Sequence, residues 1–329
     1  MWDNNLKIKL VMNIYTVGNI NEIPKGMAVS VGMFDGVHLG HRKVLEALQA
    51  FAKKLGTEPL AITFDCHPRY VLRNDDGFHL LNTNEERYRI IEQYGIHNVL
   101  EIHFTPQVAQ LSACEFARKY LVQQLEIKGL LLGYDNMFGN KSNNDFDNIP
   151  VLAKECGFAI ANEGSMLLND LKISSTQIRK ALAVGEIALA NRMLGYRYQI
   201  SGTVVHGREV GRTLHFPTAN VEIDDQHKML PADGVYCVET EVDGLLHKAM
   251  CNIGSQPTFG SDKRAVEVHL FDFDSDIYGK TVTLSFVGKI RDIKKFDTSE
   301  ELVSQLNKDK AECLALFQNH KNEGLCEDL

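Results

Sequence analysis

Long apolar runs are absent from this chain of 329 residues. No segment approaches the roughly 18 consecutive apolar residues that a membrane-spanning helix requires. The first residues, Met1 to Asn5, also lack the basic start and apolar stretch of a secretory signal. These absences argue against an integral membrane or exported protein. They predict a cytoplasmic protein without a membrane partner.

Paired cysteines are also absent. The chain has seven cysteines, which are odd in number, scattered along the sequence and without a C-x-x-C pair. This pattern fits neither a disulfide framework nor a zinc knuckle. We therefore expect reduced thiols, which agrees with a cytoplasmic location.

An excess of positive charge is the third absence, because 35 Lys and Arg residues stand against 43 Asp and Glu residues, giving a net charge of −8. Proteins that act on nucleic acid are usually basic, so the composition predicts no nucleic-acid partner. Local basic clusters can still bind a small anionic ligand. The sequence carries no signal for the oligomeric state, which stays open.

The composition, with 44% hydrophobic and 24% charged residues, is that of a globular chain, and its length suggests about two domains. Residues 1–11 show no pattern, and Met12 is a plausible natural start. From Met27 to Gly133, short apolar strands alternate with helices, which predicts a doubly wound parallel α/β domain over residues 12–190. The expected strands are Ala28–Val31, Pro59–Phe64, Asn98–Ile102 and Gly129–Leu132, and the expected helices are His41–Lys54, Glu85–Tyr94 and Ala113–Gln124.

The texture of the sequence changes after a helical stretch, Arg179–Leu194, that ends at Gly195. From Tyr198 onward, β-branched residues alternate with polar ones between glycines and short turns. Strands without intervening helices predict a small antiparallel β-barrel over residues 197–329, closed by a helix at Ser299–Phe317. The expected strands are Gln199–Val205, Gly234–Glu241, His247–Asn252, Ala265–Phe271 and Thr281–Gly288.

The most informative segment is Val29–His41, which reads as a buried strand, a glycine-rich turn and a helix that opens with two histidines. Gly36 and Gly40 let the backbone approach a ligand closely. The start of the helix directs amide donors and its positive dipole end at an anion. His38 and His41, three residues apart, are placed to donate to phosphate oxygens. The segment therefore predicts a phosphate-binding site.

Other interpretations of this segment are weaker. A glycine-rich turn between a strand and a helix is common, and a single histidine there often only caps the helix. The pair in the pattern H-x-G-H is instead typical of nucleotidyltransferases. The zinc motif H-E-x-x-H spaces its histidines differently and needs an adjacent glutamate. Gly279-Lys280-Thr281 resembles the end of a P-loop, but it lies between strands and lacks the first glycine.

Polar segments follow three of the expected strands of the first domain, namely Phe34-Asp35, His67-Pro68-Arg69 and Tyr134-Asp135. In a parallel sheet the carboxyl ends of the strands lie at one edge, where ligands bind. We therefore expect these segments to converge.

The first domain resembles the adenylyltransferase half of the bacterial bifunctional riboflavin kinase/FAD synthetases. The resemblance implies that the FMN phosphate attacks the α-phosphate of ATP, releasing pyrophosphate. It also implies that His38 and His41 are catalytic, and that a set of further residues binds the nucleotide: Gly32, Phe34, Asp35, Gly40, Asp135, Ser174, Ser175, Thr176 and Arg179. The blocks that carry the resemblance are Gly32–His41, Thr63–Arg69, Gly133-Tyr134-Asp135 with Phe138-Gly139, and Ile173–Arg179.

The second domain is similar to the flavokinase half of the same family. The resemblance implies that ATP phosphorylates riboflavin, with Mg²⁺ as the metal. It further implies Glu267 as general base, Thr218 and Asn220 at the metal, Gly207 and Gly211 around the phosphates, and Arg291 at the flavin. The blocks are Gly207–Asn220 with its P-T-A-N, Gly234-Val235-Tyr236, Asn252-Ile253-Gly254 with Pro257-Thr258-Phe259, and Val266–Leu270 followed by Phe273 and Tyr278-Gly279.

The first domain departs from the family in the loop 133–145. Asn136, Met137 and Ser142 stand where an aromatic residue and two basic residues are usual, Cys66 replaces a proline, and Gln177 replaces a frequent arginine. The expected function is synthesis of FMN from riboflavin and then of FAD from FMN, with ATP as co-substrate in both steps. The alternative is a riboflavin kinase whose first domain is a degenerate nucleotide-binding regulatory module.

Overall fold

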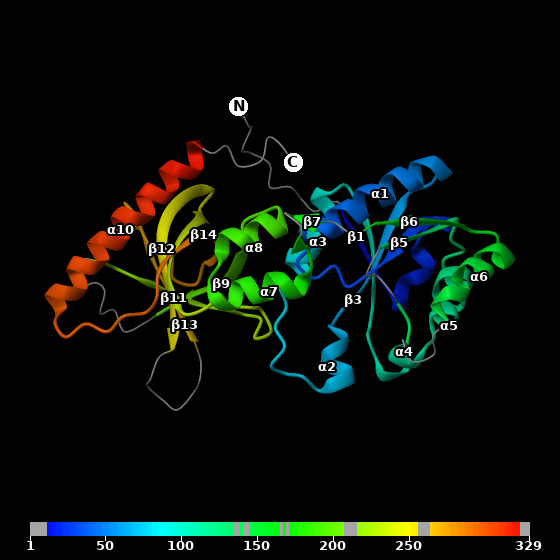
Figure 1. Ribbon diagram of the computed structural model, residues 1–329, viewed down its shortest axis with the longest axis horizontal. Helices are drawn as coiled ribbons and strands as arrows, with labels where there is room; N and C mark the ends of the chain where they lie inside the picture. Colours follow the sequence, from blue (N-terminus) through cyan, green and yellow to red (C-terminus); the bar gives the residue numbers. More distant parts are fainter. Residues whose placement is uncertain are drawn as a thin grey trace. The chain divides into compact units, whose positions relative to one another are not determined.

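The computed structural model describes residues 12–133, 138–140, 145–164, 167–168, 171–206, 216–255 and 264–322 (Figure 1). The chain divides into two compact units, Met1–Ser175 and Thr176–Leu329. Within the described ranges, no helix is both long enough and apolar enough to cross a membrane.

The first unit contains a six-stranded sheet in the order β1-β4-β3-β2-β5-β6, and every neighbouring pair is parallel. This confirms the predicted parallel α/β sheet. A short antiparallel pair, β7 and β8, lies outside it. The strands are β1 Asn13–Thr16, β2 Ala28–Val31, β3 Pro59–Phe64, β4 Asn98–Ile102, β5 Gly129–Gly133, β6 Ala159–Glu163, β7 Leu167–Leu168 and β8 Leu171–Lys172.

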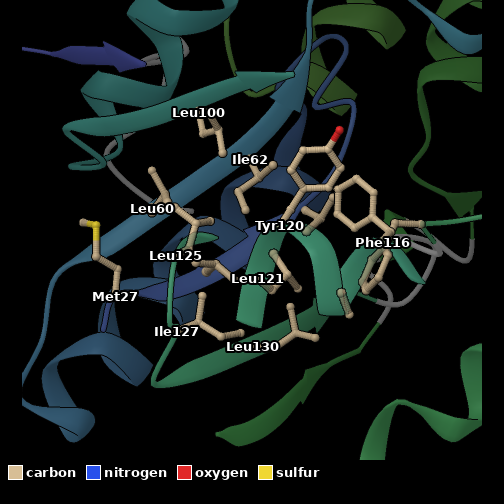
Figure 2. Packing of buried hydrophobic residues seen from close by; sticks show 14 of the residues in the cluster. Met27, Leu60, Ile62, Leu100, Phe116, Tyr120, Leu121, Leu125, Ile127 and Leu130 are labelled. Atoms are coloured by element: carbon tan, nitrogen blue, oxygen red, sulfur yellow. The ribbon is translucent and has the colours of Figure 1, made fainter. Parts of the chain in front are cut away.

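Helices cover both faces of this sheet, as a doubly wound fold requires. Helices α1 and α3 bury Leu45, Leu48 and Ile91 against one face. On the other face, Phe116, Tyr120 and Leu121 form one buried cluster with the strand residues Leu60, Ile62 and Leu100 (Figure 2). The helical segments are η1 Val17–Glu22, α1 Leu39–Leu55, α2 Pro68–Arg73, α3 Asn84–Gln93, α4 Pro106–Gln110, α5 Ala113–Phe116, η2 Ala117–Gln124, η4 Phe146–Asn148 and α6 Ile149–Cys156.

The helix expected over Ala113–Gln124 differs from the prediction in its winding. Only α5 is an α-helix, and η2 continues it as a π-helix. At the end of η2 the amide of Leu125 donates to the carbonyl of Tyr120, five residues back, at 3.1 Å. The apolar pattern predicted a helix here but could not distinguish the two windings.

The second unit contains a closed antiparallel barrel in the strand order β10-β13-β12-β11-β14-β9, which confirms the predicted barrel. Helix α10 (Ser299–Asn322) lies along it (Figure 1), where Cys313 and Phe317 pack on Cys237 and Met250. The strands are β9 Gln199–Val205, β10 Ala219–Glu222, β11 Gly234–Val242, β12 Leu245–Ser255, β13 Arg264–Leu270 and β14 Thr281–Arg291.

The expected helix Arg179–Leu194 is two helices, α7 (Ser175–Val184) and α8 (Ile187–Leu194). Gly185 separates them with φ +79°, a left-handed conformation that favours glycine. A Cβ atom at this position would lie 2.6 Å from the side chain of Lys289 on β14. The contacts therefore group these helices with the barrel. The predicted domain limits, 12–190 and 197–329, stay a prediction.

Candidate active sites

The glycine-rich segment after β2 lies at the switch point of the parallel sheet. Strand β2 has β3 on one side and β5 on the other, and the chain continues from β2 to β3 and from β5 to β6 in opposite directions across the sheet. Ligands of open α/β sheets bind at this place. The amide of Gly32 still extends the sheet by donating to the carbonyl of Ile62 at 2.9 Å.

The turn that follows is strained. Phe34 and Val37 adopt positive φ angles of 49° and 30° without being glycines, and both side chains are fully buried. A left-handed conformation is uncommon for large or β-branched residues and costs on the order of 1–3 kcal/mol. The amide of Val37 closes the turn by donating to the carbonyl of Phe34 at 3.0 Å. Such strain is concentrated at functional sites, where the surrounding packing maintains it.

His38 and His41 lie together at the start of α1, as the sequence predicted. His38 is the N-cap, and its Nδ1 accepts from the amide of His41 at 3.3 Å. Because Nδ1 is an acceptor, the ring is neutral and its proton resides on Nε2. The two imidazole rings stack with centroids 3.7 Å apart, and Phe34 meets His41 edge-on at 5.4 Å.

The pKa of His41 is held well below its usual value by burial, and further by the nearby His38 and Arg87. His41 is therefore neutral at physiological pH. Its Nδ1 is buried and has no hydrogen-bond partner among the described residues. A buried, unpaired ring nitrogen is costly, so an incoming ligand or water is its natural partner.

Asp35 stabilises the turn through hydrogen bonds of its side chain and its main-chain carbonyl. Its side chain is 3% exposed, and its carboxylate accepts from the amides of Leu81 at 2.8 Å and Asn82 at 3.4 Å. Its carbonyl accepts from the hydroxyl of Ser175 at 2.7 Å. The structure therefore joins two blocks that are 140 residues apart in sequence.

The remaining predicted nucleotide residues have different positions. Gly40 packs under His38, since a Cβ atom there would lie 3.2 Å from the imidazole ring. Ser174 precedes α7, whereas Thr176 and Arg179 lie in its first turns and group with the second unit. Asp135, Met137 and Ser142 lie outside the described residues, so convergence of the third segment, Tyr134-Asp135, is not described.

The His67 block, the second of the three segments expected to converge, follows the adjacent strand β3. His67 caps α2 by accepting from the amide of Arg69 at 3.2 Å, and its ring packs on Phe78 with centroids 4.3 Å apart.

One functional candidate near this edge of the sheet was missed by the sequence analysis. Arg87 of α3 is 1% exposed and donates to the carbonyl of Phe64 at the end of β3. A charged residue in an amphipathic helix gives no sequence signal of burial.

A second cluster lies on the barrel. Asn220 of β10 and Glu267 of β13 are directly opposite each other, and Asn252 of β12 is opposite Glu267 on the other side. Directly opposed residues share a face of a sheet. The neighbours Val266 and Val268 are 2% and 1% exposed and fill the interior, so the three polar residues lie on the outer face. Sequence reasoning assigned Asn220 and Glu267 to the site, whereas it named Asn252 only within a block that carries the resemblance.

The segment before β10 is hydrogen-bonded to β13, the strand that carries Glu267. Nδ1 of His269 donates to the carbonyl of Pro217 at 2.8 Å, and burial lowers the pKa of His269. Thr218 follows directly and is partly exposed. A cavity of about 550 Å³ opens beside this segment. Its lining includes Phe216, Pro217, His269, Phe273, Val303 and Lys310. Gly207 and Gly211 lie outside the described residues.

Arg291 has a protein partner. Its Nε and Nη2 donate to Asp309 of α10 at 3.0 and 2.8 Å, and the Asp309 side chain is fully buried. Nη1 donates to the carbonyl of Asp292 at 3.0 Å. The residue thus fastens α10 to β14. A contact with flavin, expected from the sequence, stays a prediction.

The two units match two family models in the same order as the two sites. Residues 20–177 match the model for FAD synthetase, and residues 194–317 match the model for riboflavin kinase.

Curated relatives span almost the whole chain. A bifunctional riboflavin kinase/FMN adenylyltransferase from Bacillus subtilis is 35% identical over 305 residues, which is 91% of this chain and 95% of the relative. A protein of the same name from Escherichia coli K12 is 35% identical over 94% of this chain and 98% of its own length. A crystal structure described as a macrolide-efflux protein from Streptococcus pneumoniae superposes with a TM-score of 0.83 at 32% identity, covering 91% of this chain and 97% of that one.

Proposed function

The chain belongs to the bifunctional riboflavin kinase/FMN adenylyltransferase family, and we propose that its two reactions occur at the two sites described above. The protein phosphorylates riboflavin to FMN and then transfers an adenylyl group from ATP to FMN, forming FAD. The observation that carries the proposal is the separate match of each unit to one of the two activities. The sequence-based limits assign residues 12–190 to adenylyl transfer and 197–329 to the kinase, and we propose that α7 and α8, which group with the barrel, stabilise the kinase domain.

In the kinase reaction, the terminal ribityl hydroxyl of riboflavin attacks the γ-phosphorus of ATP, and ADP leaves. Glu267 is the proposed general base that takes the hydroxyl proton. Its strand holds it rigidly beside Asn220 and Asn252. Phosphoryl transfer needs mainly positioning and neutralisation of charge, so a single well-placed base is sufficient protein chemistry.

The donor set beside Glu267 suits a hard divalent cation. The Thr218 hydroxyl and the Asn220 amide supply oxygen ligands of the kind that Mg²⁺ prefers, and the substrate phosphates supply more. ATP-dependent transferases of this kind use a divalent metal, and we propose Mg²⁺, held by Thr218 and Asn220. When bound, such a cation neutralises charge on the transferred phosphates.

The cavity beside Pro217 is the proposed site for the nucleoside part of ATP. Its lining is mixed, since it includes the aromatic residues Phe216 and Phe273 and the polar residues His269 and Lys310. Aromatic faces stack on a purine, and the cavity adjoins the segment that leads to Thr218. A nucleotide bound there has its phosphates directed toward the proposed metal ligands.

In the adenylyl-transfer reaction, a phosphate oxygen of FMN attacks the α-phosphorus of ATP. The bond from that phosphorus to the bridging oxygen breaks, and pyrophosphate leaves. No protein nucleophile is required. His38, through its Nε2 proton, and His41 stabilise the charge that develops on the phosphates. Ser174, Ser175, Thr176 and Arg179 are proposed to bind the triphosphate.

A single assay tests the function. Purified protein is incubated with riboflavin, ATP and Mg²⁺, and the flavins are separated by chromatography. Accumulation of FAD through FMN is expected. FMN alone would favour the alternative of a kinase with a regulatory first domain, and repeating the assay with Mn²⁺ or without metal tests the metal assignment.

A further inference from the structure

Arg87 is a buried cation that the reaction scheme above does not use. Its side chain is 1% exposed. Nη1 donates to the carbonyl of Met33 at 3.2 Å, and Nη2 donates to the carbonyl of Phe64 at 2.8 Å and to Oδ1 of Asn84 at 3.0 Å. A guanidinium cannot lose its proton in a protein, so this site keeps a full positive charge.

The positions of the Met33 and Phe64 carbonyls show which two segments Arg87 connects. Met33 belongs to the glycine-rich segment after β2, and Phe64 is the last residue of β3. One guanidinium therefore bridges the carboxyl ends of two adjacent parallel strands, at the edge where the phosphate-binding turn begins. The hydroxyl of Thr63 also donates to the Met33 carbonyl, at 3.2 Å. The Met33 carbonyl therefore accepts hydrogen bonds from two side chains, those of Arg87 and Thr63.

In the described part of the chain, Arg87 has no hydrogen bond or ion pair with an acidic side chain. Its guanidinium donates to carbonyls and an amide and lies 5.4 Å from the centroid of the Tyr88 ring, and its Nε has no hydrogen-bond partner. The acid Glu101 is connected to Arg87 only indirectly, through Asn84, whose Nδ2 donates to Glu101 at 3.1 Å, and through Tyr88, whose hydroxyl donates to the same carboxylate. Burying a charge without a counterion is costly. An anionic substrate bound at the turn offsets part of that cost.

The field of Arg87 reaches the histidine pair, because it is one of the causes that lower the pKa of His41. The other groups that face His41 are His38, whose Nδ1 accepts from the His41 amide, and Phe34. The carboxylate of Asp35 in the same turn accepts from the amides of Leu81 and Asn82. Arg87 thus adds a permanent positive charge to the surroundings of a neutral imidazole.

We propose that Arg87 is a positioning residue for adenylyl transfer, which fixes the strand ends that carry the turn and supplies a permanent positive charge toward the bound polyphosphate. The inference rests on the proposed adenylyl transfer at this site. It assigns Arg87 to the binding of an anionic ligand through the turn, and not to contact with the reacting atoms.

The test compares Arg87→Gln, Arg87→Lys and the matched control Arg89→Gln, which removes an exposed arginine of the same helix. FMN and ATP are supplied to the full chain, and FAD formation is measured from pH 5 to 9. Arg87→Gln is expected to lower kcat/KM by roughly 10²-fold, the range for loss of one preorganised electrostatic contribution. The KM for ATP rises, and the acid limb of the profile moves to higher pH, since His41 protonates more easily without the neighbouring charge. Arg87→Lys is expected to keep part of the rate that Arg87→Gln loses, and its acid limb should lie close to the wild-type pH.

Thermal unfolding of each variant separates a loss of fold from a loss of function. If Arg87→Gln does not fold, the folded Arg87→Lys decides, because a lysine keeps the charge and loses the two-carbonyl fork. Wild-type rates and an unshifted acid limb in the folded variants would overturn the proposal. So would an equal loss in Arg89→Gln. Absence of FAD formation in the wild-type protein would instead contradict the proposed function.

Discussion

The hydroxyl of Ser175 donates to the main-chain carbonyl of Asp35 at 2.7 Å, so the end of the first unit is joined to the turn that carries the two histidines. Asp35 is in turn held by the amides of Leu81 and Asn82. This arrangement couples the hydroxyl-rich block at the start of α7 to the proposed phosphate site through one side chain.

Ser175→Ala is expected to weaken FAD formation about 5- to 10-fold, because a net hydrogen bond contributes about 1 kcal/mol. The loss should appear mainly in the KM for ATP, since the hydroxyl orients the turn. Phosphorylation of riboflavin by the same sample is the internal control and should not change. A variant with wild-type KM in both reactions would show that this contact is dispensable for nucleotide binding.

His41→Ala is expected to reduce FAD formation by roughly 10²–10³, comparable with removal of one preorganised donor. His41 belongs to the first unit, so the rate of riboflavin phosphorylation should stay at the wild-type value. The two rates are measured on one preparation, by following FAD from added FMN and FMN from riboflavin. A folded variant that loses both activities would contradict two separate sites.

The lowered pKa of His41 also predicts how the stability of the first unit depends on pH. Between the folded pKa and the unfolded value near 6.5, the unfolded chain binds the proton and the folded chain does not, so stability falls as pH decreases through this window. His41→Gln removes this contribution. Chemical unfolding at pH 7.5 and 5.5 should therefore show a smaller loss of stability in His41→Gln than in the wild type. An equal loss of stability in the two proteins would show that protonation of a group other than His41 causes the pH dependence.

Much of the first unit could be predicted because its signals are local. Strands β3 and β4 have the predicted limits, since each is a short apolar run between turn residues. Strand β10 was not predicted, because Ala219–Glu222 is only four residues long and gains its pairing from β9 and β13. Its existence depends on partners that are distant in sequence.

The site residues show the same limit. The histidine pair was predicted because both residues lie in one segment with a recognisable pattern. The burial of Arg87 and the alignment of Asn252 with Glu267 depend on which helix face and which strand register the tertiary structure selects. A one-residue change of register would move Asn252 to the other face of the barrel. No sequence pattern determines that choice here.

Glu267→Gln is expected to lower the turnover of riboflavin phosphorylation by roughly 10²–10⁴, the range for a positioned general base. The affinity for ATP should stay near the wild-type value, because the base acts on the acceptor hydroxyl. Glu241→Gln, at an exposed position near the end of β11, is the matched control. Full turnover in Glu267→Gln would leave positioning and metal as the sole contributions to this step.

The last prediction concerns which fragment contains a complete kinase unit. Helix α8 buries Ile187, Met193 and Leu194, and Asn191 links it to the barrel. Its Nδ2 donates to the carbonyl of Phe286 at 2.9 Å, and its Oδ1 accepts from the amide of Tyr198 at 2.8 Å. Each fully buried aliphatic side chain contributes about 1.5–3 kcal/mol, so removing the helix costs several such contributions.

A fragment of residues 176–329 should therefore fold and phosphorylate riboflavin, whereas a fragment of residues 197–329 should unfold at a lower temperature. The Asn191→Ala variant of the longer fragment should lie between the two, because it leaves a buried amide and a buried carbonyl without their partner while keeping the apolar contacts. Thermal unfolding followed by circular dichroism measures all three. Equal melting temperatures for the two fragments would show that α7 and α8 contribute nothing to the barrel, and the boundary near residue 197 would then be the correct one.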